Sequence, residues 1–251
     1  MRHKDVVKMV KGMRSKKTKE QKKISNLEKI KSTAKKVVHS NQNKDYFLEL
    51  LQTKSSILIL GDGNLSFSKS LKDKIDGLLY PTVYDSMDRL VGKYPKVPDN
   101  LDALGDIVNF KVDCTKLHTY KWILKLDFDC VVFNFPHCGR GIVDQAENIK
   151  QNQQLLLKMF KSVRMINTTG TPHVCVTLKD QHPYTEWDIK YIAKQHGYVC
   201  VRSCAFFPEH FEGYEHRRTI GFKEGLSSVN NEELNKCKTF IFTFDVSEIG
   251  K

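Results

Sequence analysis

The sequence predicts an α/β protein built on a single doubly wound sheet. Short apolar runs typical of buried strands alternate with longer segments of helical periodicity, which is the pattern of a mainly parallel sheet covered by helices. The first run, residues 57–60, leads directly into Gly61-Asp62-Gly63. Such a glycine turn is typical of the first strand–helix connection, where nucleotide-like ligands bind. Taken alone, Gly-x-Gly is equally compatible with an ordinary tight turn.

The positive charge of the chain is concentrated near its N-terminus. Residues 1–44 hold 15 of the 41 Lys and Arg residues but only 3 of the 29 Asp and Glu residues, which leaves 26 of each in residues 45–251. We therefore predict a basic arm over residues 1–44 and a globular domain over residues 45–251. The arm is expected to be disordered over residues 1–23 and helical over residues 24–38. RNA binding, nuclear or nucleolar targeting and a merely solvated helix are all compatible with it.

Several classes of protein are not expected. No run approaches the length of a membrane span, and the N-terminus has no apolar segment of the signal-peptide kind. The seven cysteines are odd in number, form no Cys-x-x-Cys motif and lie partly in apolar strands. They are therefore interpreted as reduced core residues of an intracellular protein, and no metal site is predicted.

The remaining elements follow in order along the chain. Further strands are predicted at residues 80–84, 108–112, 128–133, 173–178, 199–203 and 240–244. Helices are predicted at residues 46–51, 65–75, 142–165 and 184–196, with a helical end at 101–104. Asn64 or Ser66 is suited to cap the helix after the glycine turn, and Gly197 is suited to end the helix at 184–196.

Acidic residues follow the second and third predicted strands. Asp85 lies about 20 residues after the glycines, where a carboxylate commonly binds a ribose, although Asp85 or Ser86 could equally cap the next helix. Asp113 follows residues 108–112 and is suited to the adenine amino group. The third glycine of the dinucleotide motif is replaced by Ser66, and no lysine-containing phosphate loop is present. These features favour S-adenosylmethionine, which has no phosphate, over NAD or ATP.

The fourth predicted strand runs into Asn134-Phe135-Pro136-His137, where the reacting group faces the cofactor in this architecture. We interpret these four residues as the candidate catalytic segment. The glycines at 139 and 141 predict a flexible loop over it. A helix cap at Asn134 and a structural hydrogen bond at His137 are the alternatives.

The chain carries a series of motifs in a fixed order. They are GDGNLSFSKSL, YDS, KYPKV, VDCTKL, FNFPHCG, IKQNQQLL, HVCVTLK, PYTEW and GYEHRRT. Over roughly residues 54–222 this series resembles the 25S ribosomal RNA uridine-N3 methyltransferases, a family with a Rossmann-like domain. The first turn reads G-D-G-N instead of the family's usual G-E-G-D. Methyltransferases also generally place an acid at the position of Ile59, so Asp62 is the candidate contact for the methionine ammonium.

The resemblance implies S-adenosylmethionine-dependent methylation of uridine N3 in large-subunit ribosomal RNA, with the pre-ribosome as partner and the nucleolus or nucleus as location. The cytoplasm, and either another RNA substrate or a catalytically silent assembly factor, remain alternatives. The predicted cofactor-binding residues are Gly61, Asp62, Gly63, Asn64, Ser66, Asp85 and Asp113.

The substrate side is assigned by the chemistry of uracil. His137 is the candidate base for the N3 proton, Asn134 the candidate donor to a uracil carbonyl, and Phe135 the candidate stacking ring. His216, Arg217 and Arg218 are the candidate RNA contacts. An ion pair of these arginines with Glu215 is the alternative. The oligomeric state is not predicted.

Overall fold

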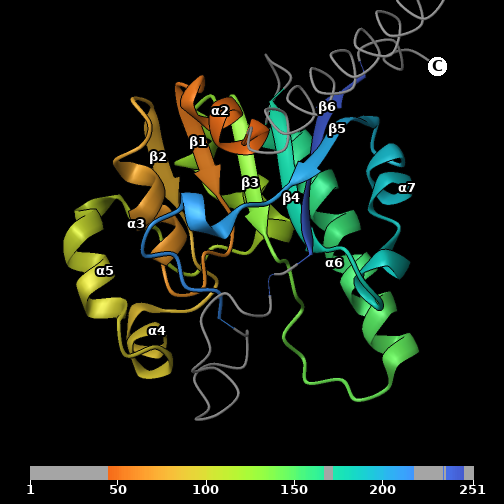
Figure 1. Ribbon diagram of the computed structural model, residues 1–251, viewed down its shortest axis with the longest axis horizontal. Coiled ribbons are helices and arrows are strands. Elements are labelled where there is room, and N and C mark those ends of the chain that lie inside the picture. Colours follow the sequence, from red (N-terminus) through yellow and green to blue (C-terminus); the bar gives the residue numbers. More distant parts are fainter. Residues whose placement is uncertain (1–44, 167–171, 218–233, 235, 246–251) are drawn as a thin grey trace, which may run out of the picture. The chain divides into compact units, whose positions relative to one another are not determined.

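The computed structural model describes residues 45–166, 172–217, 234 and 236–245, so the basic arm predicted over residues 1–44 lies outside the described residues. Six strands form one sheet in the order β2-β1-β3-β4-β6-β5 (Figure 1). Their bounds are β1 (Ser56–Ile59), β2 (Leu78–Pro81), β3 (Cys130–Asn134), β4 (His173–Lys179), β5 (Tyr198–Ala205) and β6 (Cys237–Phe244). The α/β class predicted from the sequence is confirmed.

The order and direction of the strands identify the edge of the sheet at which ligands usually bind. Strands β1 to β4 run parallel, whereas β6 is antiparallel to both of its neighbours, β4 and β5. From β1 the chain passes to β2 on one side and later returns to β3 on the other. The strand order therefore reverses between β1 and β3, and in open α/β sheets such a switch point is the usual ligand site.

Both faces of the sheet are buried, as its apolar strands predict. Leu58 and Leu60 pack in a core with α6 (Gln145–Ile166) and α7 (Ile189–Lys194). Ile57 and Ile59 point to the opposite face and pack with α2 (Tyr46–Gln52) and α3 (Ser66–Lys72). A third cluster gathers α4 (Met87–Lys93) and α5 (Val97–Leu104) around Leu65. The alternation of side chains along β1 thus explains why every residue of its apolar run is buried.

Two predicted elements differ from the structure. Residues 108–112 were expected to form a strand, but they make only an isolated parallel bridge between Asn109 and Thr82. Lys111 has a φ of 59°, which ends the extended conformation. The helix predicted at 184–196 is divided at Asp188, whose φ is 44°, into a 3₁₀ turn at Tyr184–Trp187 and α7.

Gly197 lies two residues beyond Gln195, the C-cap of α7, and has a φ of +77°. A Cβ atom at this position would lie 2.6 Å from the ring of Phe244. That ring contacts Tyr198 and is covered by the guanidinium of Arg164 at 3.9 Å, so it has little room to move. Glycine is therefore required here both by the backbone conformation and by the close approach of β6.

Replacement of Gly197 by alanine is expected to destabilise the protein. The left-handed conformation costs about 1–2 kcal/mol for a residue with a Cβ atom, and the overlap with Phe244 adds about 1–3 kcal/mol. Gly213→Ala is the matched control, because Gly213 has a φ of +79° but open space around it. Urea unfolding of both variants measures the difference. Equal losses of stability would show that Phe244 yields and that the backbone alone requires glycine.

Candidate active site

The glycine turn after β1 lies close to two aromatic side chains. Gly61 has a φ of +59°, and a Cβ atom there would lie 2.9 Å from the ring of Phe133 in β3. A Cβ atom on Gly63 would lie 3.6 Å from the hydroxyl of Tyr94. The turn thus brings bare backbone to the switch point, as the sequence predicts for a ligand-binding turn.

The polar side chains of this turn are bonded within the protein. The Asp62 carboxylate is buried and accepts a hydrogen bond of 2.7 Å from the backbone N–H of Ser68 in α3. Burial raises the pKa of Asp62, against the lowering effect of its hydrogen bonds from Ser68 and Phe67. Asp62 therefore supports the first turn of α3, whose N-cap, Leu65, makes no side-chain capping bond. The prediction that Asn64 or Ser66 caps this helix is wrong for the N-cap position, which is Leu65, although Oδ1 of Asn64 accepts from the backbone N–H of Ser66 at 3.3 Å.

Asn64 and Ser66 instead hold a segment from the far end of the domain. The Asn64 amide donates to the backbone carbonyl of Glu215 at 3.1 Å. The Ser66 hydroxyl donates to Oδ1 of Asn64 at 2.8 Å and accepts from the backbone N–H of Glu215 at 2.9 Å. All three residues are buried. Residues 213–217, which carry the predicted RNA contacts, are thereby fixed beside the glycine turn.

The side chain of Glu215 joins two cations at this point. Its carboxylate pairs with Nζ of Lys96 at 2.5 Å and with the guanidinium of Arg217 at 2.6 Å. The Arg217 side chain is only 12% exposed, so its charge is directed into the protein. This is the ion pair that the sequence left open as an alternative to RNA binding. Arg218 lies outside the described residues.

Asp85 lies after β2, in a partly buried position that is 13% exposed. One carboxylate oxygen pairs with Lys93 at 2.6 Å and the other with Arg89 at 3.2 Å. Ser86 is the N-cap of α4, so the capping role that the sequence left open belongs to Ser86. Burial raises the pKa of the neighbouring Tyr94 to about 12, with a further increase from the charge of Asp85 and an opposing effect of Arg217.

Asp113 has a local role in the structure. Its Oδ1 accepts hydrogen bonds from the backbone and the hydroxyl of Thr115 at 2.9 and 2.7 Å, which begins the 3₁₀ segment Cys114–Thr119. Its predicted contact with an adenine amino group stays a prediction.

The last residue of β3 and the segment after it present hydrogen-bond donors. Oδ1 of Asn134 accepts from the Thr177 hydroxyl at 2.6 Å, while its Nδ2 is buried without a partner in the described part of the chain. Nδ1 of His137 accepts from the backbone N–H of Gly139 at 3.0 Å. Burial lowers the pKa of His137, which favours the neutral ring. In that ring the proton is on Nε2, so His137 also offers a donor.

Phe135 connects this segment to the aromatic residues near the end of β5. It has a φ of 50°, follows Asn134 and precedes the buried Pro136. Its ring centroid lies 4.5 Å from that of His216 and 5.6 Å from that of Phe206. The structure thus brings the predicted His216 against the predicted catalytic segment.

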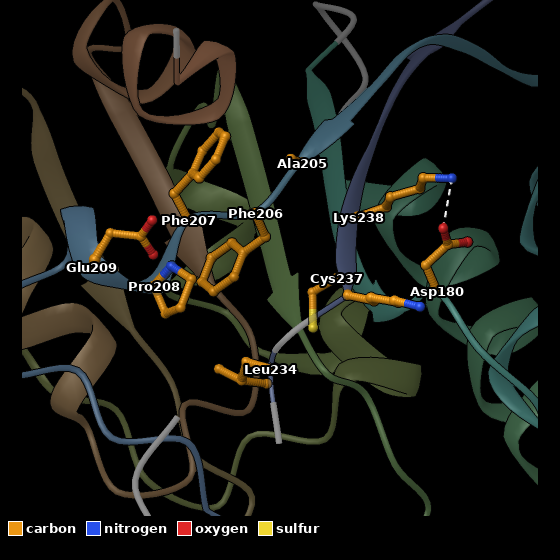
Figure 2. Close-up of a pocket in the computed structure, with 10 residues that line it drawn as sticks. Asp180, Ala205, Phe206, Phe207, Pro208, Glu209, Leu234, Cys237 and Lys238 are labelled. Carbon is orange, nitrogen blue, oxygen red and sulfur yellow. Dashed lines mark ion pairs between the residues drawn. The ribbon is translucent and has the colours of Figure 1, made fainter. Parts of the chain in front are cut away.

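Phe206 also lines a cavity of about 470 Å³ at the carboxyl end of β4 and β5 (Figure 2). Figure 2 shows Phe206, Leu234 and Cys237 around its centre, with the ion pair of Asp180 and Lys238, 2.7 Å long, at one side. Glu209 and Lys236 complete its charged lining. This cavity was not predicted from the sequence, because its walls come from segments that lie far apart in the chain.

Several residues of the site were not assigned a role from the sequence. They are Lys93, Tyr94, Lys96, Thr177 and Thr239. The first three lie in the KYPKV motif, whose position in the ordered series was the available signal. Within the described part of the chain, no group of three or more His, Cys, Asp and Glu residues could hold a metal ion, and no helix could span a membrane.

Removal of the Glu215 charge is expected to destabilise the domain. Glu215→Gln removes the carboxylate charge that Arg217 and Lys96 share, in a position where Arg217 is poorly solvated, which costs about 3 kcal/mol. Glu147→Gln is the matched control, since Glu147 pairs with Lys150 at 3.8 Å on the surface, and its loss is expected to cost about 0.5 kcal/mol. The free energy of unfolding in urea tests the difference. Similar values for both variants would contradict a structural role of the Glu215 charge.

Comparison with known proteins supports the family suggested by the motifs. Residues 58–218 match the family model described as rRNA (uridine-N3-)-methyltransferase BTM5-like. The 25S rRNA (uridine(2634)-N(3))-methyltransferase of Saccharomyces cerevisiae is 30% identical over an alignment 315 residues long, which covers 100% of this chain and 90% of that protein. Uncharacterized protein At4g26485 of Arabidopsis thaliana is 29% identical over 74% of this chain and 91% of its own length.

Among solved structures, a methyltransferase homolog protein from Pyrococcus horikoshii is 16% identical, with a TM-score of 0.49 over 80% of this chain and 65% of its own. The family model covers more than half of the sequence, and the yeast protein aligns along the whole of it. The chain therefore belongs to the rRNA (uridine-N3-)-methyltransferase BTM5-like family.

Proposed function

We propose that the protein is an S-adenosylmethionine-dependent methyltransferase that acts on N3 of a uridine in large-subunit ribosomal RNA. The observation that carries the proposal is the placement of the glycine turn after β1 and of Asn134 and His137, at and after the end of β3, at the carboxyl ends of two neighbouring parallel strands. Family membership supports the reaction. The pre-ribosome is the proposed partner and the nucleolus or nucleus the proposed location, with the cytoplasm as the alternative.

The residues around the glycine turn fit the cofactor. The turn has no lysine to bind a phosphate, and its two glycines leave the backbone open to close approach. A carboxylate has about four lone-pair positions, so Asp85 retains capacity for ribose hydroxyls beside its pairs with Arg89 and Lys93. Because the side chains of Asp62, Asn64 and Ser66 are bonded within the protein, we assign cofactor contact at this turn to the backbone. When bound, the cofactor supplies an electrophilic methyl group.

The chain's own groups are suited to stabilise the reacting base. N3 of uracil lies on the Watson–Crick edge, so the target must be unpaired or flipped out. Loss of its proton leaves negative charge on the two flanking carbonyl oxygens. Asn134 Nδ2 and His137 Nε2 are both donors, and preorganised donors stabilise developing anions. We therefore favour stabilisation of the deprotonated base, with the proton lost to solvent, over proton abstraction by His137. Phe135 is the proposed stacking partner.

Nucleoside mass spectrometry of large-subunit ribosomal RNA tests this function. RNA from cells with and without the protein would be compared for 3-methyluridine. Loss of the nucleoside, restored by the wild-type chain, is the expected result. Unchanged 3-methyluridine would contradict the proposal and favour another RNA substrate or a catalytically silent assembly factor.

Asp85→Ala is expected to weaken cofactor binding by roughly 100-fold, the value of about two hydrogen bonds to a charged group. Isothermal titration with S-adenosylmethionine measures the affinity. Asp88→Ala, which removes an exposed carboxylate from the same region, serves as the control and should bind normally. His137→Ala should also bind the cofactor normally while methyl transfer falls. Wild-type affinity in Asp85→Ala would refute the ribose assignment.

We place part of the RNA substrate in the cavity beside Phe206. Single-stranded RNA is commonly bound by aromatic surfaces next to basic side chains. Phe206 lines the cavity, and its ring contacts that of Phe135. Lys236, which also lines the cavity, is exposed and has no ion pair among the described residues. In contrast, Lys238 is already paired with Asp180.

Lys236→Ala is therefore expected to raise the KM for ribosomal RNA several-fold, with kcat and cofactor affinity unchanged. Steady-state methylation of extracted ribosomal RNA measures both constants. Lys190→Ala is the control, because Lys190 lies on α7, away from the lining of the cavity. An unchanged KM in Lys236→Ala would remove the cavity from the RNA path.

A further inference from the structure

Three polar side chains lie in one row across the carboxyl half of the sheet. Asn134 of β3 pairs in register with Thr177 of β4, and Thr177 pairs in register with Thr239 of β6. The Thr177 hydroxyl lies 2.6 Å from Oδ1 of Asn134 and 2.9 Å from the Thr239 hydroxyl. Both threonines are completely buried. Burial of two hydroxyls among apolar strands is unfavourable unless they are hydrogen-bonded, and here both hydroxyls are bonded within the row.

The hydrogen atoms of this row determine which end of the Asn134 amide faces outward. A threonine hydroxyl has a single hydrogen to donate. Thr177 donates its hydrogen to Oδ1 of Asn134, so the contact with Thr239 requires Thr239 to be the donor. The amide oxygen is therefore occupied by the sheet, and the NH₂ group is the end left for another partner.

That NH₂ group has no partner in the described part of the chain, although it is buried. An unsatisfied buried donor raises the free energy of the folded protein, and such groups often mark a functional site. A ligand carbonyl that reached Nδ2 would recover this free energy. In the reversed arrangement, with Nδ2 bonded to Thr177, the amide would present an acceptor instead.

We infer that Thr177 and Thr239 are positioning residues that hold the Asn134 amide as a donor and thereby select uracil over cytosine. The inference rests on the proposed function. Uracil has a carbonyl on each side of N3, and we assign the one at C4 to Nδ2, because cytosine keeps the carbonyl at C2. Cytosine has an amino group at C4, which is a donor and would oppose the same amide. Discrimination of bases thus depends on hydroxyls that do not themselves touch the substrate.

Thr177→Val removes the hydroxyl while nearly keeping the shape of the side chain. Extracted large-subunit ribosomal RNA that lacks the modification, and synthetic copies with cytidine at the modified position, would serve as substrates. We expect kcat on uridine to fall about tenfold, the value of one hydrogen bond of about 1.4 kcal/mol. The ratio of uridine to cytidine methylation should fall by a similar factor, while cofactor affinity stays unchanged. Mass spectrometry of 3-methyluridine and 3-methylcytidine gives both rates.

Three further variants separate positioning from simple structural support. Thr177→Ser keeps the hydroxyl and should restore turnover and base preference to within a few-fold of wild type. Thr239→Val should produce a smaller loss of base preference, because Thr177 can still donate to Asn134. Thr243→Val, a half-buried position of the same strand β6, is the control and should behave as wild type.

The side-chain amide signals of Asn134 provide a readout that does not depend on turnover. Assigned through Asn134→Asp, they should shift when RNA containing the target uridine is added to the wild-type protein, and not with the cytidine copy. Wild-type turnover and base preference in Thr177→Val would overturn the inference, even with the proposed function intact. Absence of 3-methyluridine formation by the wild-type protein would instead refute the proposed function and this inference together.

Discussion

The candidate site depends on the attachment of residues 213–217 to the glycine turn. Glu215 is the center of this attachment, because Asn64 and Ser66 bind its backbone while Lys96 and Arg217 neutralise its carboxylate. These contacts join parts of the chain that are about 150 residues apart, as the 151-residue separation of Asn64 and Glu215 shows. One consequence is that His216 contacts Phe135, so the glycine turn and the segment that follows β3 share one support.

The two ends of the proposed reaction are supported by different means. On the cofactor side, charged side chains are paired, with Asp85 between Lys93 and Arg89. On the substrate side, neutral donors follow β3, and the groups that orient them are neutral as well. This division suits a reaction in which a cationic methyl donor meets a base that becomes anionic. Paired charges near the methyl donor limit the net electrostatic field that acts on it. Neutral dipoles near the uracil stabilise negative charge only as that charge develops.

The sequence predicted those features that depend on local pattern. The apolar run at 57–60 and the two glycines after it were sufficient to predict a buried strand and the strand–helix turn that follows it. Long-range contacts gave no comparable signal. Nothing near Ser66 indicates that it binds Glu215 instead of capping α3. Likewise, Thr177 and Thr239 become neighbours only because β6 lies beside β4, and the order of strands cannot be read from the periodicity of each strand.

The place of β6 has a consequence for how the chain matures during synthesis. Among the strands of the described residues β6 is the last in the sequence, yet it lies inside the sheet between β4 and β5. Domains emerge from the ribosome N-terminal end first, so the nascent chain contains β1 to β3 and the glycine turn well before residues 213–217 and Thr239 are synthesised. Until β6 inserts, the edge of β4 is open and the Asn134 amide lacks the last of its supports. The row of hydroxyls that orients the Asn134 amide is thus completed only when β6 has joined the sheet.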